Sequence, residues 1–344
     1  MQRIRINPRF DVLYYSFYLQ GLRQLFPQAV YSYSGQDFPP VTWHNGFACV
    51  LEDGDQPPLK VWIDAGDGTH IDGPALEWCD TYAKVNLDSR DLSPMARAKI
   101  LTLGPSYGVQ IWSALLTPIH ALRTYYASQP RLDWTRTHFA NYWRQWRYRL
   151  AERAYVPAPS SPDYIFFTGS LWKEEPQTNS DRAAFIRACR DLPDIRFEGG
   201  FAPRSQNDIP AFADLILTAP YSLPQYLARL QASLVAFNTP AVRSCLGWKL
   251  AEFLALGKAI ISTPLARDLP SPLIHGEHIH YVDGSVIAIQ QAVRHIAQDT
   301  AYRRHLEQNA RRYYDTYLRP HQVIPQIIRH AQRNARPETG STGC

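Results

Sequence analysis

The sequence predicts an α/β protein with parallel sheets, built as two domains. Three observations indicate this class. The chain has 344 residues, more than one ordinary hydrophobic core accommodates. The segment VPAPSSP at residues 156–162 is rich in proline and serine and has no apolar period, as expected for a linker. After this linker, short apolar strands alternate with helical patterns, which is typical of a parallel sheet.

The second half of the chain shows this alternation most clearly. An apolar strand at 164–168 is followed by the turn Gly169-Ser170, and Gly257 stands where glycine commonly ends a helix. Further strands are expected at 195–198, 233–237, 259–262 and 280–282. Helices are expected at 180–190, 223–230, 248–256, 286–297, 302–317 and 321–331. We place the first domain at 1–157, the second at 158–336 and a flexible tail at 337–344.

The first half gives weaker signals. Residues 11–26 indicate a short strand and an aromatic helix, and residues 132–153 indicate a long helix. Strands are expected at 46–51, 59–64 and 80–87. The strand at 59–64 ends in the glycine-rich loop Asp64-Ala65-Gly66-Asp67-Gly68.

Composition is typical of a soluble protein in a reducing compartment. Hydrophobic residues make up 45% and charged residues 19% of the chain, and the net charge of +5 is too small to indicate nucleic-acid binding. The five cysteines are scattered and form no C-x-x-C pair, which argues against a disulfide framework or a zinc knuckle. Neither a signal peptide nor a stretch of ~20 apolar residues is present, so we expect a cytoplasmic protein.

Two segments of the second domain are candidates for an anion site, because ligands of such sheets bind beyond the carboxyl ends of the strands. Residues 169–173, GSLWK, combine small residues with a cation, although a plain turn is the commoner meaning of such a glycine. In residues 238–257, Gly247 precedes a helix whose free N–H groups favour a phosphate. Arg243 lies just upstream, and Lys249 lies in the first turn.

Lys249 and Glu252 are three residues apart and therefore share one face of that helix. Two cations and a helix N-terminus suit a diphosphate. A carboxylate one turn deeper suits the vicinal hydroxyls of a ribose, because it accepts two hydrogen bonds. Spacing alone is equally compatible with an ordinary surface Lys–Glu pair.

The segment WKLAEFLALGKAIISTPL resembles the donor-binding segment of the group 1 (GT4-like) superfamily of GT-B glycosyltransferases. Members typically read Glu, seven residues, Glu, then Ala-Met-Ala-x-Gly-x-Pro-Val-Val. Glu252 and residues 257–261 match the second half, and Gly247 falls on the glycine between the two acids, but Ser244 replaces the first acid. A branch that includes spore-maturation-type proteins reads Arg…Trp/Phe-Lys-x-x-Glu, and this chain is similar to that branch. Residues 169–173 resemble the Gly-Arg-Leu…Lys loop of the superfamily.

The resemblance is specific at 243–264, extends over 164–317 and is faint in the first half. It implies a GT-B fold of two facing Rossmann-like domains, with a GDP- or UDP-linked sugar donor on the second domain and the acceptor on the first. It also implies that the last helix crosses back to the first domain, with residues 321–331 as the candidate. Beyond the donor itself, no cofactor is implied. The donor site then comprises Gly169, Ser170, Lys173, Asn238, Arg243, Ser244, Gly247, Trp248, Lys249 and Glu252.

A base for the acceptor hydroxyl would come from the first domain. Asp64 and Asp67 end a strand that faces the expected cleft, and His70 follows closely, so any of the three is a candidate to accept a proton. A plain turn is the alternative interpretation of DAGDG. The acceptor expected for such an enzyme is a glycan, a lipid-linked glycan or a protein.

Two motifs invite a metal interpretation, and context argues against both. Asp53-Gly54-Asp55 is a D-x-D motif, but it runs into Pro57-Pro58 as a turn would. The histidines of HGEHIH at 275–280 lie in a predicted loop without further ligands nearby. We therefore expect no metal site and a metal-independent activity.

The long helix of the first domain allows two interpretations. Phe139, Tyr142, Trp143, Trp146 and Leu150 share one helical stripe, with arginines around it. Such a helix can rest on an anionic membrane, as a lipid-linked acceptor would require, which gives a peripheral location at the inner membrane face. It can equally be a packed helix whose arginine stems cover apolar surface.

Three functions compete at this stage. The first is a GT-B glycosyltransferase, retaining or inverting. The second is a GT-B nucleotide-sugar epimerase, which needs several acids and histidines around the sugar and is weakened by Ser244. The third is a non-catalytic module that binds a nucleotide sugar.

Overall fold

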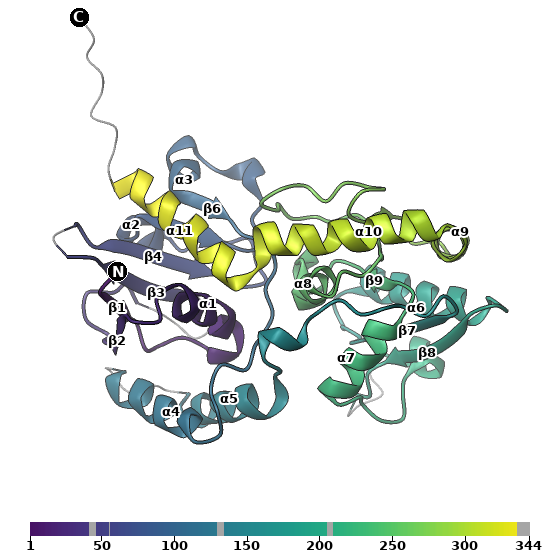
Figure 1. Cartoon of the computed structure of the whole chain (residues 1–344), viewed down its shortest axis with the longest axis horizontal. Helices are drawn as coiled ribbons and strands as arrows, with labels where there is room; N and C mark the ends of the chain where they lie inside the picture. Colours follow the sequence, from purple (N-terminus) through teal and green to yellow (C-terminus); the bar gives the residue numbers. More distant parts are fainter. Residues whose placement is uncertain (41–45, 55, 129–133, 205–208, 336–344) are drawn as a thin grey trace, which may run out of the picture. The chain divides into compact units, whose positions relative to one another are not determined.

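The computed structural model describes residues 1–40, 46–54, 56–128, 134–204 and 209–335, and the chain divides into two compact units (Figure 1). Unit 1 comprises Met1–Ala151 and Asp268–Pro270, and the chain returns to it from Tyr317 onward. Unit 2 comprises Glu152–Arg267 and Ser271–Thr316. The tail predicted at 337–344 lies outside the described residues.

Unit 1 is built on one mixed sheet. Its strands, in order across the sheet, are β2 (Val30–Tyr33), β1 (Arg3–Ile6), β3 (Phe47–Glu52), β4 (Leu59–Asp64), β5 (Thr81–Lys84) and β6 (Ile100–Thr102). The α/β class with parallel strands is confirmed, except that β3 is antiparallel to both β1 and β4. The chain between Glu52 and Leu59 is too short for the helical crossover that a parallel pair requires.

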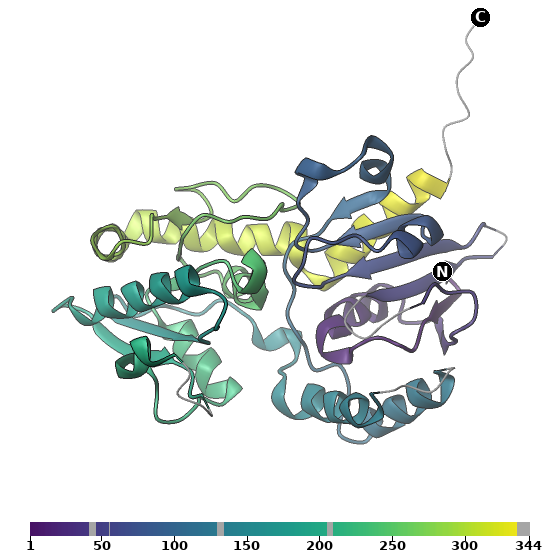
Figure 2. The same ribbon diagram turned by 180° about the vertical axis from the view of Figure 1, so that it is seen from behind.

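The helices of unit 1 include one from the far end of the chain. They are α1 (Val12–Leu25), α2 (Gly73–Trp78), α3 (Pro94–Lys99), α4 (Leu116–Ala127), α5 (Thr135–Tyr148) and α11 (Pro320–Ala335), with a 3-10 turn at Ser89–Asp91. Helix α11 packs against α1, β4 and β5 (Figure 2). Gly21 permits the close approach of α1 and α11, because a Cβ there would lie 2.4 Å from the carbonyl oxygen of Pro320.

The strands of unit 2 are all paired in parallel. β7 (Tyr164–Gly169) pairs with β8 (Arg196–Phe201), and β10 (Ile260–Ser262) lies between β9 (Ala236–Asn238) and β11 (His280–Tyr281). The backbone N–H of Leu234 donates to the carbonyl oxygen of Tyr164 at 2.6 Å, which holds the start of β9 beside β7. The segments that follow β7 and β9 therefore lie side by side.

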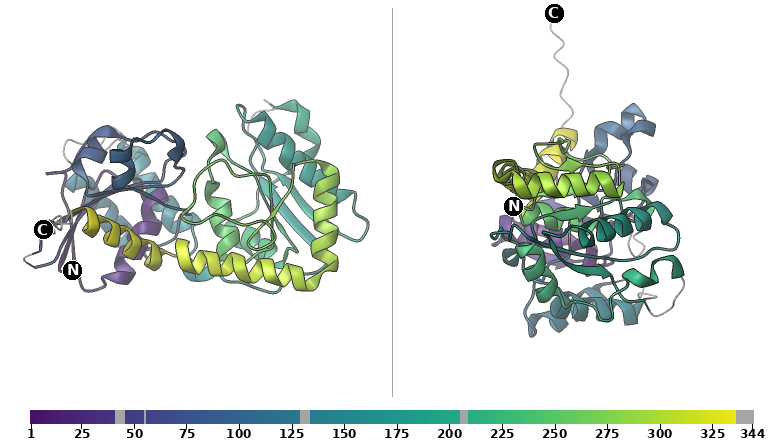
Figure 3. Two further views of the ribbon diagram at one scale, coloured as in Figure 1. Left: turned by 90° about the horizontal axis from the view of Figure 1, so that it is seen from above. Right: turned by 90° about the vertical axis from the view of Figure 1, so that its right-hand side faces the viewer.

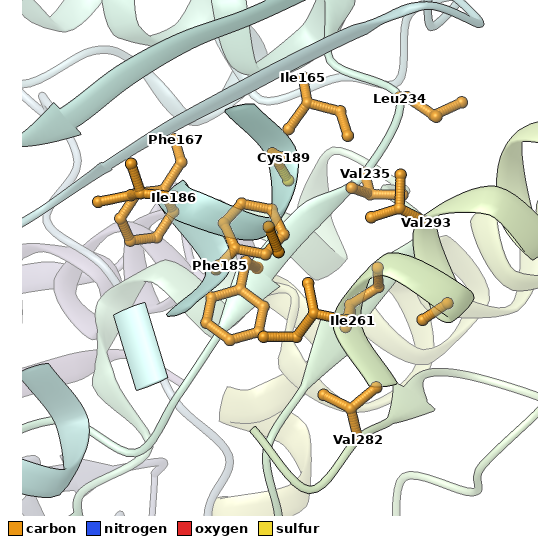
Figure 4. Close-up of a cluster of buried hydrophobic side chains, with 14 of the residues drawn as sticks. Ile165, Phe167, Phe185, Ile186, Cys189, Leu234, Val235, Ile261, Val282 and Val293 are labelled. Atoms are coloured by element: carbon orange, nitrogen blue, oxygen red, sulfur yellow. The ribbon is translucent and has the colours of Figure 1, made fainter. Parts of the chain in front are cut away.

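Helices surround the strands of unit 2 (Figure 3). They are α6 (Pro176–Arg190), α7 (Leu223–Ala232), α8 (Gly247–Ala255), α9 (Val286–Gln298) and α10 (Thr300–Tyr313), with 3-10 turns at Glu152–Ala154, Pro210–Leu215 and Val242–Ser244 and a π-helical turn at Tyr314–Leu318. In the core, the rings of Phe185 and Phe237 stack with centroids 4.3 Å apart, among Ile186, Ile261 and Val293 (Figure 4). Across the described residues, none of the helices combines the length and the apolar character of a membrane span.

Helix α5 buries a different face from the predicted aromatic stripe. Its buried side chains are His138, Asn141, Tyr142 and Gln145, so Tyr142 is the only stripe residue of this helix in the buried set. Two of the polar members are held by hydrogen bonds, since Asn141 donates to the Asp11 carboxylate and the Gln145 amide donates to the carbonyl oxygen of Val109. The Trp143 side chain is 48% exposed. Hydrogen bonding, which the apolar pattern ignores, therefore decides how α5 is oriented.

Candidate functional site

A pocket of unit 2 opens beyond the ends of β7 and β9, at the N-terminus of α8. It has about 570 Å³ of empty volume, its open mouth included. The lining residues are Phe167, Ser170, Trp172, Arg182, Phe237, Asn238, Thr239, Ala241, Leu246, Gly247, Trp248 and Lys249. Four of these are aromatic and two are cationic, so the pocket combines flat apolar walls with positive charge.

The N-terminus of α8 faces this pocket, and Leu246, the residue before the helix, makes no capping hydrogen bond with its side chain. Its first residue, Gly247, has a φ of +70°, a conformation that favours glycine. The loop just before it holds Arg243 and Ser244 at φ of +55° and +59°, where residues with side chains are strained. A strained loop that leads into a helix N-terminus is an arrangement commonly found where backbone N–H groups bind an anion.

Lys249 projects from the first turn of α8 into the pocket lining. Its ammonium donates a hydrogen bond to the carbonyl oxygen of Thr168 and lies 5.6 Å and 5.7 Å from the ring centroids of Phe167 and Tyr226. Burial, together with the nearby Arg182 guanidinium, lowers the pKa of Lys249 to about 7, against the attraction of Glu252. An anion in the pocket would restore its charged form.

Arg182 brings a second cation to the pocket from α6. Its Nε donates to Thr239 Oγ1 at 3.0 Å and its Nη1 donates to the carbonyl oxygen of Ser170 at 2.8 Å. Burial lowers the pKa of this guanidinium to about 10. Because it ties together the segments after β7 and β9, Arg182 both shapes the pocket and charges it.

Glu252 lies one turn deeper than Lys249 and is held in place. Its Oε2 accepts a hydrogen bond from the Tyr226 hydroxyl at 2.9 Å. Burial, together with the charge of Glu252, raises the pKa of Tyr226 well above its usual value, so the phenol remains a donor. The carboxylate is 8% exposed, and it stands behind the lining rather than in it.

The structure places five of the ten predicted donor residues in the pocket lining, one directly before it and four outside it, Glu252 among these four. Ser170, Asn238, Gly247, Trp248 and Lys249 line the pocket. Gly169 ends β7 directly before them.

Lys173, Arg243 and Ser244 do not belong to the lining of that pocket. Lys173 lines an adjoining hollow with Trp172 and Arg204. The backbone N–H of Arg243 donates to the Glu175 carboxylate at 2.6 Å, and its side chain is exposed. With Ser244 it shapes the turn before α8.

Two residues of the site were missed by the sequence analysis. Arg182 and Tyr226 come from helices far from residues 238–257, and spacing does not connect them. A signal for Arg182 did exist, because Thr178 and Arg182 occupy the same helical face as the apolar Phe185 and Ile186 of α6. A cation on the buried face of a helix indicates a function more often than one on its solvated face.

In unit 1, Asp64 at the end of β4 is a buried structural anion. Its Oδ2 accepts from Lys84 Nζ at 2.9 Å and from the Tyr82 hydroxyl at 2.8 Å, and its Oδ1 accepts from the backbone N–H of Gly66. Asp64 and Lys84 are register partners on the parallel strands β4 and β5. The ion pair and these hydrogen bonds fix the start of the loop in which Asp67 and His70 lie, half-buried and exposed respectively.

The side chains of the D-x-D motif and of the histidine motif at 275–280 that the structure describes interact with groups other than a metal ion. The Asp53 carboxylate pairs with the amino group of Met1 at 2.7 Å, and Asp55 lies outside the described residues. His275 and His278 accept from backbone N–H groups, and His280 Nδ1 bonds to the Tyr302 hydroxyl at 2.8 Å. Among the described residues, no group of three or more His, Cys, Asp or Glu side chains has the geometry to hold a metal ion.

Comparison with known proteins gives distant structural similarity. No protein-family model matches the chain, and no curated protein does. The chain is similar to the S. aureus MnaA–UDP co-structure, with a TM-score of 0.46, 11% identity and 97% of each chain covered. It is similar to a glycosyltransferase from Rickettsia africae ESF-5, with a TM-score of 0.42, 9% identity, and 92% of this chain and 74% of the other covered. It is also similar to the C-terminal domain of a glycosyl transferase group 1 family protein (LpcC) from Francisella tularensis, with a TM-score of 0.33, 15% identity, and coverage of 48% and 96%.

The chain is a mixed α/β protein with parallel strands, and its second unit carries a cationic, aromatic-lined pocket at a helix N-terminus.

Proposed function

We propose that the protein is a glycosyltransferase of the GT-B type that takes a sugar from a nucleotide-diphosphate donor, with UDP or GDP as the nucleotide. The observation that carries the proposal is the convergence of Lys249, Arg182 and the N-terminus of α8 on one pocket. The resemblance of residues 243–264 to the donor segment of group 1 glycosyltransferases supports it from the sequence.

Each part of the pocket has a role toward such a donor. The N–H groups of α8 and the ammonium of Lys249 bind the diphosphate and stabilise the charge that develops on it as the sugar leaves. Aromatic walls at Phe167, Phe237 and Trp172 offer stacking surfaces to the base. Glu252, oriented by Tyr226, accepts hydrogen bonds from the ribose hydroxyls.

Of the three candidate bases for the acceptor hydroxyl, Asp64 is the least suited, and Asp67 and His70 stay candidates. Asp64 is buried and its carboxylate is engaged by Lys84 and Tyr82, so it serves to hold the loop. Asp67 is half-buried on the same loop, and His70 is exposed three residues later. The acceptor class stays open between a glycan, a lipid-linked glycan and a protein.

Titration calorimetry with UDP, GDP and their sugars tests donor binding, and release of free sugar from the nucleotide sugar tests turnover. A transferase is expected to bind one nucleotide diphosphate and to hydrolyse its sugar slowly without an acceptor. Binding without hydrolysis or transfer to any acceptor would leave the non-catalytic binding module as the better account. An interconverted nucleotide sugar as the product would identify an epimerase.

Activity is expected to survive EDTA, because Lys249, Arg182 and the N-terminus of α8 already supply positive charge at the diphosphate. Assays of sugar transfer or hydrolysis with and without the chelator check this. Complete loss of activity that Mg²⁺ or Mn²⁺ restores would contradict it.

A further inference from the structure

Helix α4 of unit 1 and Leu115, the residue that precedes it, carry large apolar side chains on the side that faces away from the protein. Leu115, Ile119, Leu122 and Tyr126 are 80%, 49%, 45% and 73% exposed. Their spacing of four, three and four residues places them on one helical face. We call these four side chains the outer face of α4.

The buried inner face of α4 explains why these large apolar side chains remain exposed. Its buried residues are the small Thr117, Ala121 and Thr124. Thr124 Oγ1 lies 3.0 Å from the Tyr142 hydroxyl of α5, and small side chains allow the two helices to pack closely. The usual amphipathic pattern is therefore inverted, and an apolar stripe of this size marks an interaction surface.

The charged side chains that α4 and α5 themselves carry are all positive. Helices α4 and α5 together carry Arg123, Arg136, Arg144 and Arg147, all exposed, and contain no aspartate or glutamate. Arg23, at the end of α1, also lies close, since it acts with Arg123 on the His120 side chain. Figures 1 and 2 show α4 and α5 side by side at one edge of unit 1.

We propose that the outer face of α4, flanked by these arginines, docks on an anionic lipid surface, with the helix lying in the plane of the interface. Apolar residues on one face and arginines beside them are what such a surface binds. A second copy of the chain is a poorer occupant, because it would bring the same arginines toward each other. The proposal does not depend on the sugar-transfer function.

Flotation with vesicles of phosphatidylcholine, with and without about one third phosphatidylglycerol, tests this. The protein is expected to float with the anionic vesicles, to stay behind with the neutral ones and to dissociate as salt rises. Ile119→Glu should weaken partitioning about tenfold or more, because it places a charge where a side chain inserts. Arg123→Gln should weaken it about fivefold.

Matched controls come from α9 of unit 2, where Ile287 is 70% exposed and Arg294 is exposed. Ile287→Glu and Arg294→Gln should leave partitioning unchanged, and circular dichroism should show that all four variants melt like the wild type. Failure to bind anionic vesicles would overturn the proposal, as would equal losses in Ile119→Glu and Ile287→Glu. A dimer in analytical ultracentrifugation that Ile119→Glu dissociates, without vesicle binding, would assign the face to a second copy instead.

Discussion

Both units place charged side chains at the carboxyl ends of parallel strands, but they treat the charges differently. In unit 1, Lys84 donates to the carboxylate of Asp64, so charge meets charge inside the protein. In unit 2, Lys249 and Arg182 donate to carbonyl and hydroxyl oxygens. The first arrangement is complete without a ligand, whereas the second leaves positive charge for an anion to compensate. The carboxyl ends of the strands thus hold a buried ion pair in unit 1 and the candidate anion site in unit 2.

The largest expected effect comes from breaking the complete pair. Lys84→Met leaves the Asp64 carboxylate buried without its counter-charge, so the free energy of unfolding should fall by about 3–5 kcal/mol. Urea denaturation measures it. Lys60→Met, which removes an exposed lysine from β4, is the control and should cost less than about 0.5 kcal/mol. Equal stability of Lys84→Met and the wild type would show that the pair does not anchor unit 1.

Removing the cation Lys249 from the pocket of unit 2 should instead lower ligand affinity and leave stability unchanged. Lys249→Met is expected to weaken binding of the nucleotide diphosphate by roughly 1.5–3 kcal/mol, while the free protein loses no stability, because the ammonium is buried at a cost. Calorimetry and thermal unfolding measure the two quantities on one variant. Lys173→Met, outside the pocket lining, should keep near wild-type affinity. Lower stability with unchanged affinity would assign Lys249 a structural role.

The pH dependence of diphosphate binding and of stability should distinguish Lys249 further from the complete ion pair of unit 1. The pKa of Lys249 is lowered to about 7, and a bound diphosphate raises it, so binding takes up a proton above pH 7. Affinity should therefore fall as pH rises through 7, by at most about tenfold per unit. In the free protein the sign is reversed. The unfolded chain binds the proton more tightly, so the Lys249 contribution to stability increases from pH 7 toward 10.5. Calorimetry in buffers of different ionisation enthalpy should detect the proton, and Lys249→Met should abolish it.

The smallest expected effect concerns the orientation of Glu252. Tyr226→Phe removes the hydrogen bond to the carboxylate but keeps the ring, so donor affinity should fall by about 0.5–1.5 kcal/mol. Glu252→Gln should cost roughly 1.4–2.8 kcal/mol in kcat/KM if the carboxylate binds ribose. Unchanged donor affinity with a kcat reduced by several orders of magnitude would instead place Glu252 in acid–base chemistry.

Local features of the site were predictable because short-range chemistry fixes them. Gly247 before a helix, Lys249 in its first turn and Glu252 one turn on follow from 3.6-residue periodicity. Strand β4 was predicted at its observed bounds, since its apolar pattern is strong and the loop after it is glycine-rich. The antiparallel direction of β3 was not, because an apolar run has the same appearance in either direction.

Partners that come from distant elements were missed, because no spacing along the chain connects them to residues 238–257. Arg243 appeared to be a pocket cation from its sequence position, but the backbone there turns through positive φ and its side chain lies outside the lining. Arg182 takes that place from α6, because Ser170 and Thr239 accept its hydrogen bonds. The aromatic stripe of α5 differs from its buried face for the same reason, because Asn141 and Gln145 make their hydrogen bonds on that buried face.

The sequence by itself determined the α/β class, most strands and helices of the second half, and the chemistry of residues 247–252. Tertiary structure alone decided that Lys84 neutralises Asp64, that Arg182 joins Lys249, and that the apolar face of α4 points outward. The physical reason is the distance along the chain over which each kind of interaction acts. Propensity, capping and periodicity act within a few residues, whereas compensation of charge and burial of surface depend on groups that only the folded chain brings together.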